Sequence, residues 1–350
     1  MTKKPKIVSL SIDAGAGGIA SSLVTYAQAC ALVGIQHSLI TASGSPAASE
    51  IADMQLGHVS ALNKHFLKLH IASGFIANRK VRKLIEEADL VLLHNAKLIR
   101  RMKRHRQKSW IVNHSGKFRF LEDAAGVIFI SERARTRYLE NTVQPNQKSV
   151  VIPHAFPFTS PPRSKSAMTN PIKFIAAGRM VPKKGFSDLV EAAIRLGSRS
   201  DEFNLTIYGD GPEYTKLENM KAAAKSQNIF LPGWTQELDK ELSDSNVFCL
   251  PSHLEPFGLV LGEAMSKSLP VIAAKTDGSS QVFGFQDPEA RGGVLYDPGD
   301  VSSLAQHMER VLNEPAFFSN LGQRAHKTIK EEFSLKKLAK HLQDLVTSKG

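Results

Sequence analysis

Cysteine is scarce in this sequence, whose 350 residues include only Cys30 and Cys249. Two cysteines cannot build a disulfide framework, and these two lack the spacing of zinc ligands. Cys30 falls in a helical pattern and Cys249 in a strand pattern. We therefore expect both to be buried, unreactive thiols.

Long apolar runs are missing as well. No segment approaches the roughly 18 consecutive apolar residues that a membrane-spanning helix requires. The apolar stretch near the N-terminus, residues 7–12, is too short for a signal peptide. We therefore expect a cytoplasmic chain that does not span a membrane.

Several motifs of cofactor and nucleic-acid sites are incomplete or absent. The glycine-rich segment 13–20 has Ala20 where the dinucleotide fingerprint needs a third glycine, which disfavours a Rossmann dehydrogenase. It also lacks the Lys-Ser/Thr ending of a P-loop. No Asp-x-Asp pair, which often holds a divalent ion on a diphosphate, occurs in the chain. Zinc-finger spacing and RNP-like strands are absent too, so we expect no nucleic-acid partner.

The chain does contain strands that alternate with helical periodicity, which is typical of parallel sheets built from βαβ units. Predicted strands cover residues 6–12, 37–41, 89–94, 109–114, 127–130, 149–153, 172–177, 204–208, 229–231, 247–250, 271–274 and 294–296. Predicted helices follow Gly17-Gly18 and cover 186–196, 212–224, 259–267, 301–312, 315–332 and 335–346.

This pattern predicts an α/β protein with two Rossmann-like domains facing a cleft. We place one domain at 1–160, a second at 161–330, and at 331–350 a C-terminal helix that packs back on the first domain. The Pro/Ser-rich stretch 157–171 is the predicted linker. Ligands bind outside the carboxyl ends of the strands in such sheets.

Charge is distributed unevenly along the chain. Residues 1–160 hold 22 Lys and Arg against 10 Asp and Glu, whereas residues 161–350 hold 23 of each kind. The whole net charge of +12 therefore lies in the first half. A partner with phosphates or an anionic surface is expected there.

Three segments carry residues suited to phosphate groups or to vicinal hydroxyls. Gly17 and Gly18 open a helix whose N-terminal amides can face a phosphate. Arg179 and Lys184 follow a strand and can hold a diphosphate. Glu255 and Glu263 lie eight residues apart across a Pro-Phe-Gly turn, and carboxylates accept hydrogen bonds from vicinal hydroxyls.

The run from Glu255 to Glu263 resembles the E-x7-E signature of glycosyltransferase family 4, whose members have the GT-B fold and retain the anomeric configuration. The resemblance extends over most of the chain, because further family motifs follow in their usual order at residues 178–179, 183–185, 208–213, 269–272 and 297–300.

This resemblance implies a retaining glycosyltransferase that uses a nucleotide-diphosphate sugar as donor and needs neither a cofactor nor a catalytic metal. It implies that Arg179 and Lys184 bind the donor diphosphate, Glu255 the sugar and Glu263 the ribose. Gly17 and Gly18 would meet the diphosphate from across the cleft. The resemblance also implies that the domain at 1–160 is the acceptor side and that the domain at 161–330 binds the nucleotide sugar. His114 matches the family's active-site histidine, and we expect it to position the sugar rather than to act as a general base. We interpret His94 as a core residue.

Basic residues gather between Arg79 and Lys108. We interpret them as a peripheral docking surface for the inner face of the cytoplasmic membrane, which would bring the enzyme to a lipid-linked glycan such as a lipopolysaccharide core or a glycolipid. A transferase with a soluble acceptor and a sugar-nucleotide epimerase of similar fold remain alternatives. The sequence does not predict the donor nucleotide, the sugar or the linkage.

Overall fold

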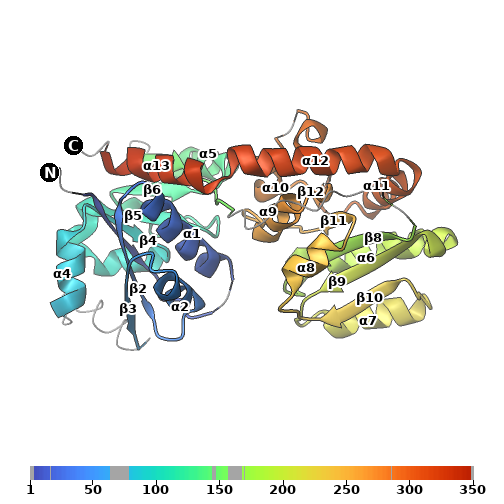
Figure 1. The fold of residues 1–350 in the computed structure, drawn as a ribbon, viewed down its shortest axis with the longest axis horizontal. Coiled ribbons are helices and arrows are strands. Elements are labelled where there is room, and N and C mark those ends of the chain that lie inside the picture. The colour runs from blue at the N-terminus through green and yellow to red at the C-terminus, as the bar shows by residue number, and fades with distance from the viewer. Residues whose placement is uncertain are drawn as a thin grey trace. The chain divides into compact units, whose positions relative to one another are not determined.

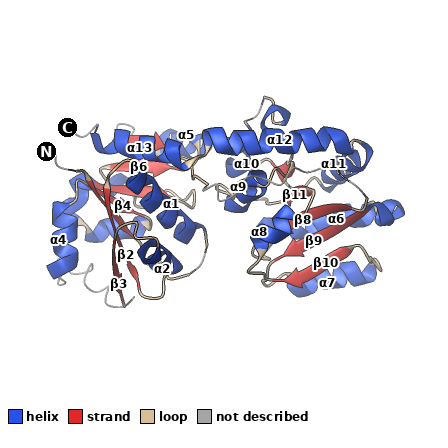
Figure 2. Ribbon diagram, viewed as in Figure 1, coloured by secondary structure: helices blue, strands red, loops and turns tan. Residues whose placement is uncertain are grey.

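The computed structural model describes residues 4–15, 17–63, 79–143, 147–156, 168, 170–284 and 286–347. The chain divides into two compact units. Unit 1 comprises 1–157 together with 333–350, and unit 2 comprises 158–332. Each unit has its own parallel sheet with helices packed on it (Figures 1 and 2). The predicted linker at 157–171 lies almost wholly outside the described residues.

The sheet of unit 1 has the strand order β3-β2-β1-β4-β5-β6-β7. All its strand pairs are parallel. The order reverses at β1, which has β2 on one side and β4 on the other, so ligands are expected at the carboxyl ends of β1 and β4. The strands are β1 (Lys6–Leu10), β2 (Gln36–Ala42), β3 (His58–Leu62), β4 (Leu90–Leu93), β5 (Ser109–Asn113), β6 (Gly126–Phe129) and β7 (Lys148–Val151).

Helices of unit 1 bury apolar faces on this sheet. α13 packs along α1, and Leu338 and Leu342 of α13 join Tyr26 and Cys30 of α1 in one apolar cluster. The C-terminal helix therefore contributes to the core of unit 1. The α-helices are α1 (Gly18–Leu32), α2 (Pro46–Asp53), α4 (Arg79–Glu87), α5 (Glu132–Asn141) and α13 (Leu335–Thr347), and the 3₁₀ helices are η1 (Ala96–Arg101), η2 (Lys103–Lys108) and η3 (Leu121–Asp123).

The sheet of unit 2 has the strand order β10-β9-β8-β11-β12-β13. This is the doubly wound order in which the first strand is central and the fourth lies beside it, so the switch point falls between β8 and β11. The strands are β8 (Ile172–Ala177), β9 (Phe203–Tyr208), β10 (Ile229–Gly233), β11 (Val247–Leu250), β12 (Val271–Ala274) and β13 (Gly293–Tyr296).

Unit 2 encloses its own core between sheet and helices. Phe174, Phe203, Leu189 and Met308 are among its fully buried side chains. Its α-helices are α6 (Phe186–Arg195), α7 (Tyr214–Ala223), α8 (Leu238–Ser243), α9 (Leu259–Ser266), α10 (Asp277–Phe283), α11 (Val301–Asn313) and α12 (Pro315–Glu332), and its 3₁₀ helices are η4 (Pro182–Lys184), η5 (Gly197–Glu202) and η6 (Glu289–Arg291).

The structure confirms the predicted strands to within a few residues at their ends and adds one edge strand, β3. Both cysteines are buried as expected, and burial raises the pKa of the Cys30 thiol to about 12. Within the described residues no helix combines the length and apolar character needed to cross a bilayer.

Candidate functional site

The switch point of unit 2 brings together two of the predicted site residues. Lys184 ends η4, which follows β8, and Glu255 lies in the loop after β11. The Lys184 ammonium donates a hydrogen bond to a carboxylate oxygen of Glu255. Both side chains are largely buried, with 18% and 11% of their surfaces exposed. An ammonium and a carboxylate are therefore held side by side at the place where ligands bind in this topology.

Backbone contacts between the two loops hold this pair in place. The amide of His253 donates to the Lys183 carbonyl at 2.9 Å. Gly185 has a φ of +64°, and a Cβ added there would stand 2.1 Å from the Pro251 carbonyl oxygen, so only glycine fits. The His253 ring also contacts the Asp188 carboxylate at 2.5 Å. The loop after β8 and the loop after β11 thus pack as one structure.

The residue before Arg179, Gly178, lies next to this pair, because a Cβ added there would be 3.7 Å from Lys184 Cε. Arg179 itself follows β8 and lines a cavity of about 310 Å³, which Lys184 and Glu255 do not line. Its side chain is exposed, and no ion pair to it is found in the described part of the chain. Tyr208 and Asp210, at the end of β9, and the exposed Trp234, after β10, also line the cavity. A guanidinium without a carboxylate partner is available to an anionic ligand.

Glu263 lies within α9, which begins directly after Gly258. The surrounding protein atoms partly desolvate its carboxyl group and raise its pKa, and the negative charge of Asp239 adds to this effect, although the residue remains exposed. The Glu255 loop is tied to the start of α10, because the Gly278 amide donates to the Glu255 carbonyl at 2.9 Å. Four predicted residues, Arg179, Lys184, Glu255 and Glu263, therefore belong to unit 2.

In unit 1, Gly17 and Gly18 are exposed at the start of α1. The segment before them is fixed by Asn95, which follows β4. The Asn95 side chain accepts a hydrogen bond from the Ile12 amide at 2.7 Å and donates one to the Asp13 carboxylate at 2.9 Å. Asn95 thus links the loops at the switch point of this sheet, a role that its place in the sequence does not indicate.

His114 lies directly after β5 and belongs to a stack of three histidine rings. The Nε2 atom of His114 and the Nδ1 atom of His94 are 3.0 Å apart. The ring centroid of His114 is 5.2 Å from that of His94 and 5.4 Å from that of His154. The Nδ1 atom of His114 is buried without a hydrogen-bond partner among the described residues. His94 and His114, predicted to have different roles, are therefore direct partners.

Burial keeps these imidazoles neutral. It lowers the pKa of His154 to about 4, and with the neighbouring His37 and His154 it lowers the pKa of His94 to about 3. Burial, followed by the charges that His94 and His154 would carry, holds the pKa of His114 well below its ordinary value. A neutral His114 can position a hydroxyl group but is a weak acid–base catalyst, in keeping with its predicted role.

The basic segment divides into paired and unpaired residues. Arg106 forms an ion pair with Asp123 at 3.3 Å, and Lys108 donates to two backbone carbonyls. On α4, Arg82 and Lys83 pair with Glu86 and Glu87. Within the described ranges no carboxylate pairs with four exposed residues, Lys97, Arg100, Lys103 and Arg104. Only part of the predicted docking surface therefore has charge available to a partner.

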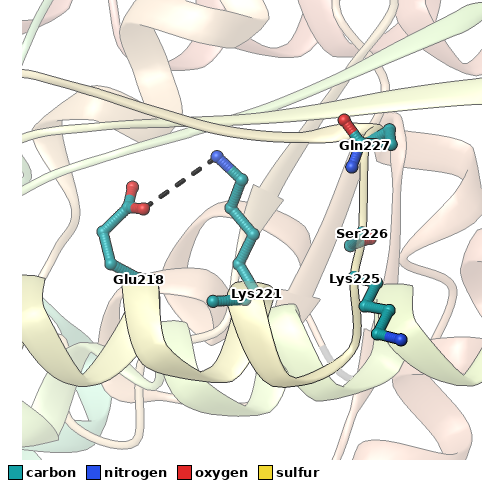
Figure 3. Close-up of a pocket in the computed structure, with 6 residues that line it drawn as sticks. Glu218, Lys221, Lys225, Ser226 and Gln227 are labelled. Atoms are coloured by element: carbon teal, nitrogen blue, oxygen red, sulfur yellow. Dashed lines mark ion pairs between the residues drawn. The ribbon is translucent and has the colours of Figure 1, made fainter.

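A second hollow, of about 390 Å³, lies at the end of α7 (Figure 3). It is lined by Glu218, Lys221, Lys225 and their neighbours, and Glu218 pairs with Lys221 at 4.0 Å. None of the predicted site residues lines it. Among the residues with described positions, no group of three or more His, Cys, Asp or Glu side chains is arranged to hold a metal ion.

Comparison with known proteins finds a family match that covers most of unit 2. Residues 161–328 match the family model described as "Glycosyl transferases group 1". The chain is 28% identical over 206 residues to a 2-deoxystreptamine N-acetyl-D-glucosaminyltransferase of Niallia circulans, covering 58% of this chain and 49% of that protein. It is also 28% identical over 176 residues to LpsE, a lipopolysaccharide core biosynthesis glycosyltransferase of Rhizobium meliloti, covering 50% and 49%. The chain thus spans about half the length of these relatives.

The fold of the whole chain is shared with solved structures. HepE of Anabaena, in a complex with UDP and glucose, superposes with a TM-score of 0.81 at 17% identity, covering 98% of this chain and 100% of the other. This similarity shows the GT-B fold. The chain thus has a GT-B fold, and its residues 161–328 match the group 1 glycosyl transferases.

Proposed function

We propose that this protein is a glycosyltransferase that moves a sugar, a hexose in the simplest case, from a nucleotide-diphosphate sugar to an acceptor. The pairing of Lys184 with Glu255, beside the unpaired Arg179, carries the proposal. It combines cations suited to a diphosphate with a carboxylate suited to sugar hydroxyls, within the segment that matches the family. The glycosyltransferase names of the relatives favour transfer over epimerisation.

The chemical task is to stabilise a leaving diphosphate. As the bond between the anomeric carbon and the diphosphate breaks, negative charge develops on the phosphate oxygens. Arg179 and Lys184 stabilise that charge, and the backbone amides at Gly17 and Gly18 add to it. Glu255 holds the sugar, Glu263 the ribose, and the neutral His114 positions a sugar hydroxyl. We propose that no metal ion or other cofactor takes part.

Donor binding and turnover test this proposal. A panel of nucleotide sugars that includes UDP-glucose should contain one that raises the melting temperature, because ligands of the native state stabilise it. Arg179→Ala should lower turnover with that donor, because the variant loses about 2–4 kcal/mol of transition-state stabilisation. Lys183→Ala, which removes an exposed cation four residues away, is the matched control and should keep its turnover.

Absence of any stabilising nucleotide sugar would contradict the proposal. Incubation with the donor alone distinguishes a glycosyltransferase from a sugar-nucleotide epimerase, because an epimerase would convert the donor into its epimer without an acceptor.

We propose that the reaction retains the anomeric configuration and forms no covalent enzyme intermediate. Two observations support this proposal: the E-x7-E resemblance, and the hydrogen bond from Lys184 that occupies a Glu255 carboxylate oxygen and so lowers its nucleophilicity. NMR of the first-formed product measures the configuration. An inverted product would overturn retention, and a trapped glycosyl adduct on Glu255 would overturn the direct mechanism.

We further propose that the acceptor is a lipid-linked glycan, such as a lipopolysaccharide core, reached by peripheral docking on the inner face of the cytoplasmic membrane. The unpaired residues Lys97, Lys103 and Arg104 support docking on anionic lipid. LpsE is named for lipopolysaccharide core biosynthesis, which supports the glycan class. Vesicle binding tests the docking, and a soluble acceptor is the alternative if it fails.

A further inference from the structure

Two arginines of unit 1 converge on one aromatic ring. The guanidinium carbons of Arg100 and Arg119 each lie 5.3 Å from the ring centroid of Phe120. The two carbons are therefore at most twice that distance apart. Arg100 lies in the last turn of η1, which follows β4, and Arg119 lies in the loop that follows the neighbouring strand β5. Segments after two adjacent parallel strands thus meet at Phe120.

Neither guanidinium is neutralised by the protein. Both side chains are exposed, and across the described ranges neither forms an ion pair with a carboxylate. The nearby Asp123 pairs instead with Arg106. Elsewhere in this unit basic residues do find carboxylates, as Lys6 does with Glu87 at 2.7 Å. Two positive groups against one ring repel each other, and the described residues supply no carboxylate that pairs with either of them.

The loop that carries Arg119 is held in shape before any ligand arrives. The buried Asn113 side chain accepts hydrogen bonds from the amides of Ser115 and Gly116 and donates one to the Lys117 carbonyl at 3.2 Å. Phe118 packs edge-on against Tyr138, with ring centroids 5.6 Å apart.

Phe120 itself has a φ of +69°. A bulky side chain rarely adopts this left-handed conformation, and such strain clusters at ligand sites. The next residue, Leu121, is fully buried and anchors the far end of the loop. Arg119 and Phe120 therefore lie between the buried Asn113 and the buried Leu121, which hold the two ends of the loop.

We propose that Arg100 and Arg119 form a binding site for a phosphate group carried by the acceptor, so that the substrate class is a phosphorylated glycan. Guanidinium groups present planar pairs of N–H donors that match phosphate oxygens, and a dianion neutralises both cations at once. The proposal rests on the proposed function, because it takes unit 1 as the acceptor side. His114 lies five residues before Arg119 in the same loop, so the phosphate anchors the acceptor near the residue predicted to position the donor sugar.

Calorimetric titration of the full chain at low salt, with glucose 6-phosphate as the probe and glucose as the neutral comparison, tests the site. Glucose 6-phosphate should bind and glucose should not. Arg100→Ala and Arg119→Ala should each weaken binding at least about tenfold, a usual loss for a charge-assisted contact. Arg104→Ala is the matched control, since it removes another exposed arginine, one with neither an ion pair nor a ring contact among the residues whose positions are described. Its affinity for the probe should be unchanged.

If Arg104→Ala weakens glucose 6-phosphate binding equally, the general positive charge of the surface attracts the probe and the proposed site is wrong. Unchanged affinity in both Arg100→Ala and Arg119→Ala would also overturn the site. Phosphatidylglycerol vesicles test whether the phosphate group is carried by a lipid headgroup instead of a glycan. If Arg119→Ala abolishes vesicle binding while the wild-type chain ignores glucose 6-phosphate, the site belongs to a lipid headgroup and the glycan assignment is wrong. The proposed transferase function is measured independently, by donor binding to the Arg119→Ala chain.

Discussion

At the scale of single residues, Lys184 has two tasks. It is the cation beside the predicted diphosphate position, and it is the partner of a largely buried carboxylate. Removing one member of such a pair leaves the other charge without compensation, which costs more free energy than removing both. A loss of activity in a Lys184 variant alone would therefore mix a stability effect with a catalytic one.

A pair of variants separates the two effects. Lys184→Met should lower the free energy of unfolding by about 1–3 kcal/mol, because Glu255 loses its hydrogen-bonding cation. Adding Glu255→Gln removes the unpaired charge and should restore most of this loss, while turnover stays low because only Arg179 of the two proposed cations still supports the leaving group. Urea unfolding and turnover are measured on the same preparations. A double variant as unstable as Lys184→Met would show that the pair does not account for the stability effect.

At the scale of elements, the site depends on the turn that joins η4 to α6. Gly185 has left-handed backbone angles and lies against the Pro251 carbonyl, so any Cβ forces the loops after β8 and β11 apart. Gly185→Ala should destabilise unit 2 by more than about 1 kcal/mol and weaken donor binding as well.

Gly197→Ala is the control for this substitution. No atom lies within 4 Å of a Cβ added at Gly197, and its φ is not in the left-handed range. The variant should be neutral in thermal melting and in donor binding. Equal melting temperatures for both alanine variants would refute the structural role of the Gly185 turn.

The histidine stack at the ends of β4 and β5 predicts a dependence of stability on pH. In the folded chain the pKa of His94 is about 3 and that of His154 about 4, whereas an unfolded histidine titrates near 6.5. Between these values the unfolded state binds more protons, so the free energy of unfolding falls as the pH falls below about 6.5 and is constant above it. Each histidine contributes up to about 1.4 kcal/mol per pH unit in that window.

The chain has two tryptophans, so in a Trp234→Phe background the fluorescence of the buried Trp110 reports on unit 1 alone. Urea unfolding between about pH 7.5 and about pH 5 should show a flatter pH dependence for His154→Gln than for the background. His58→Gln, at an exposed histidine, should leave the slope unchanged. An unaltered slope in His154→Gln would exclude the stack as the acid-sensitive element.

The sequence predicted the elements that have strong local patterns. The buried strands β11 and β12 are continuous apolar runs, β8 is apolar except for the exposed Lys173, and the bounds of all three were predicted to the residue. β3 was missed because it is an edge strand whose side chains are exposed or only half-buried, and α8 and α10 were missed because six or seven residues show too little periodicity.

Contacts between distant residues had no signal in the sequence. Lys184 and Glu255 are 71 positions apart, and His94 and His114 are 20 apart. The sequence placed His94 and His114 at strand ends, Glu255 in a loop after a strand and Lys184 at the start of a helix, but only the strand order brings these segments together. The pairing of Asn95 with Asp13 and that of His253 with Asp188 arise in the same way.

At the scale of the whole molecule, the charge asymmetry is larger between the two units than between the two halves of the sequence. Unit 1 gains the basic C-terminal helix and holds 26 Lys and Arg against 11 Asp and Glu, a net charge of +15. Unit 2 holds 19 against 22, a net charge of −3. An anionic surface should therefore attract unit 1 and leave unit 2 unbound.

Co-sedimentation with vesicles tests whether unit 1, rather than unit 2, attaches to an anionic surface. The chain should bind phosphatidylglycerol vesicles but not phosphatidylcholine vesicles, and binding should weaken as salt shortens the Debye length from about 30 Å at 0.01 M to about 8 Å at 0.15 M. Each exposed cation near the surface contributes about 1 kcal/mol, so Lys103→Gln with Arg104→Gln should weaken binding by roughly one to two orders of magnitude. The matched control, Lys216→Gln with Lys225→Gln, removes two exposed cations from unit 2 and should bind like the wild type. If the control weakens binding as much as the unit 1 pair does, net charge rather than a docking surface determines attachment, and a soluble acceptor becomes the better proposal.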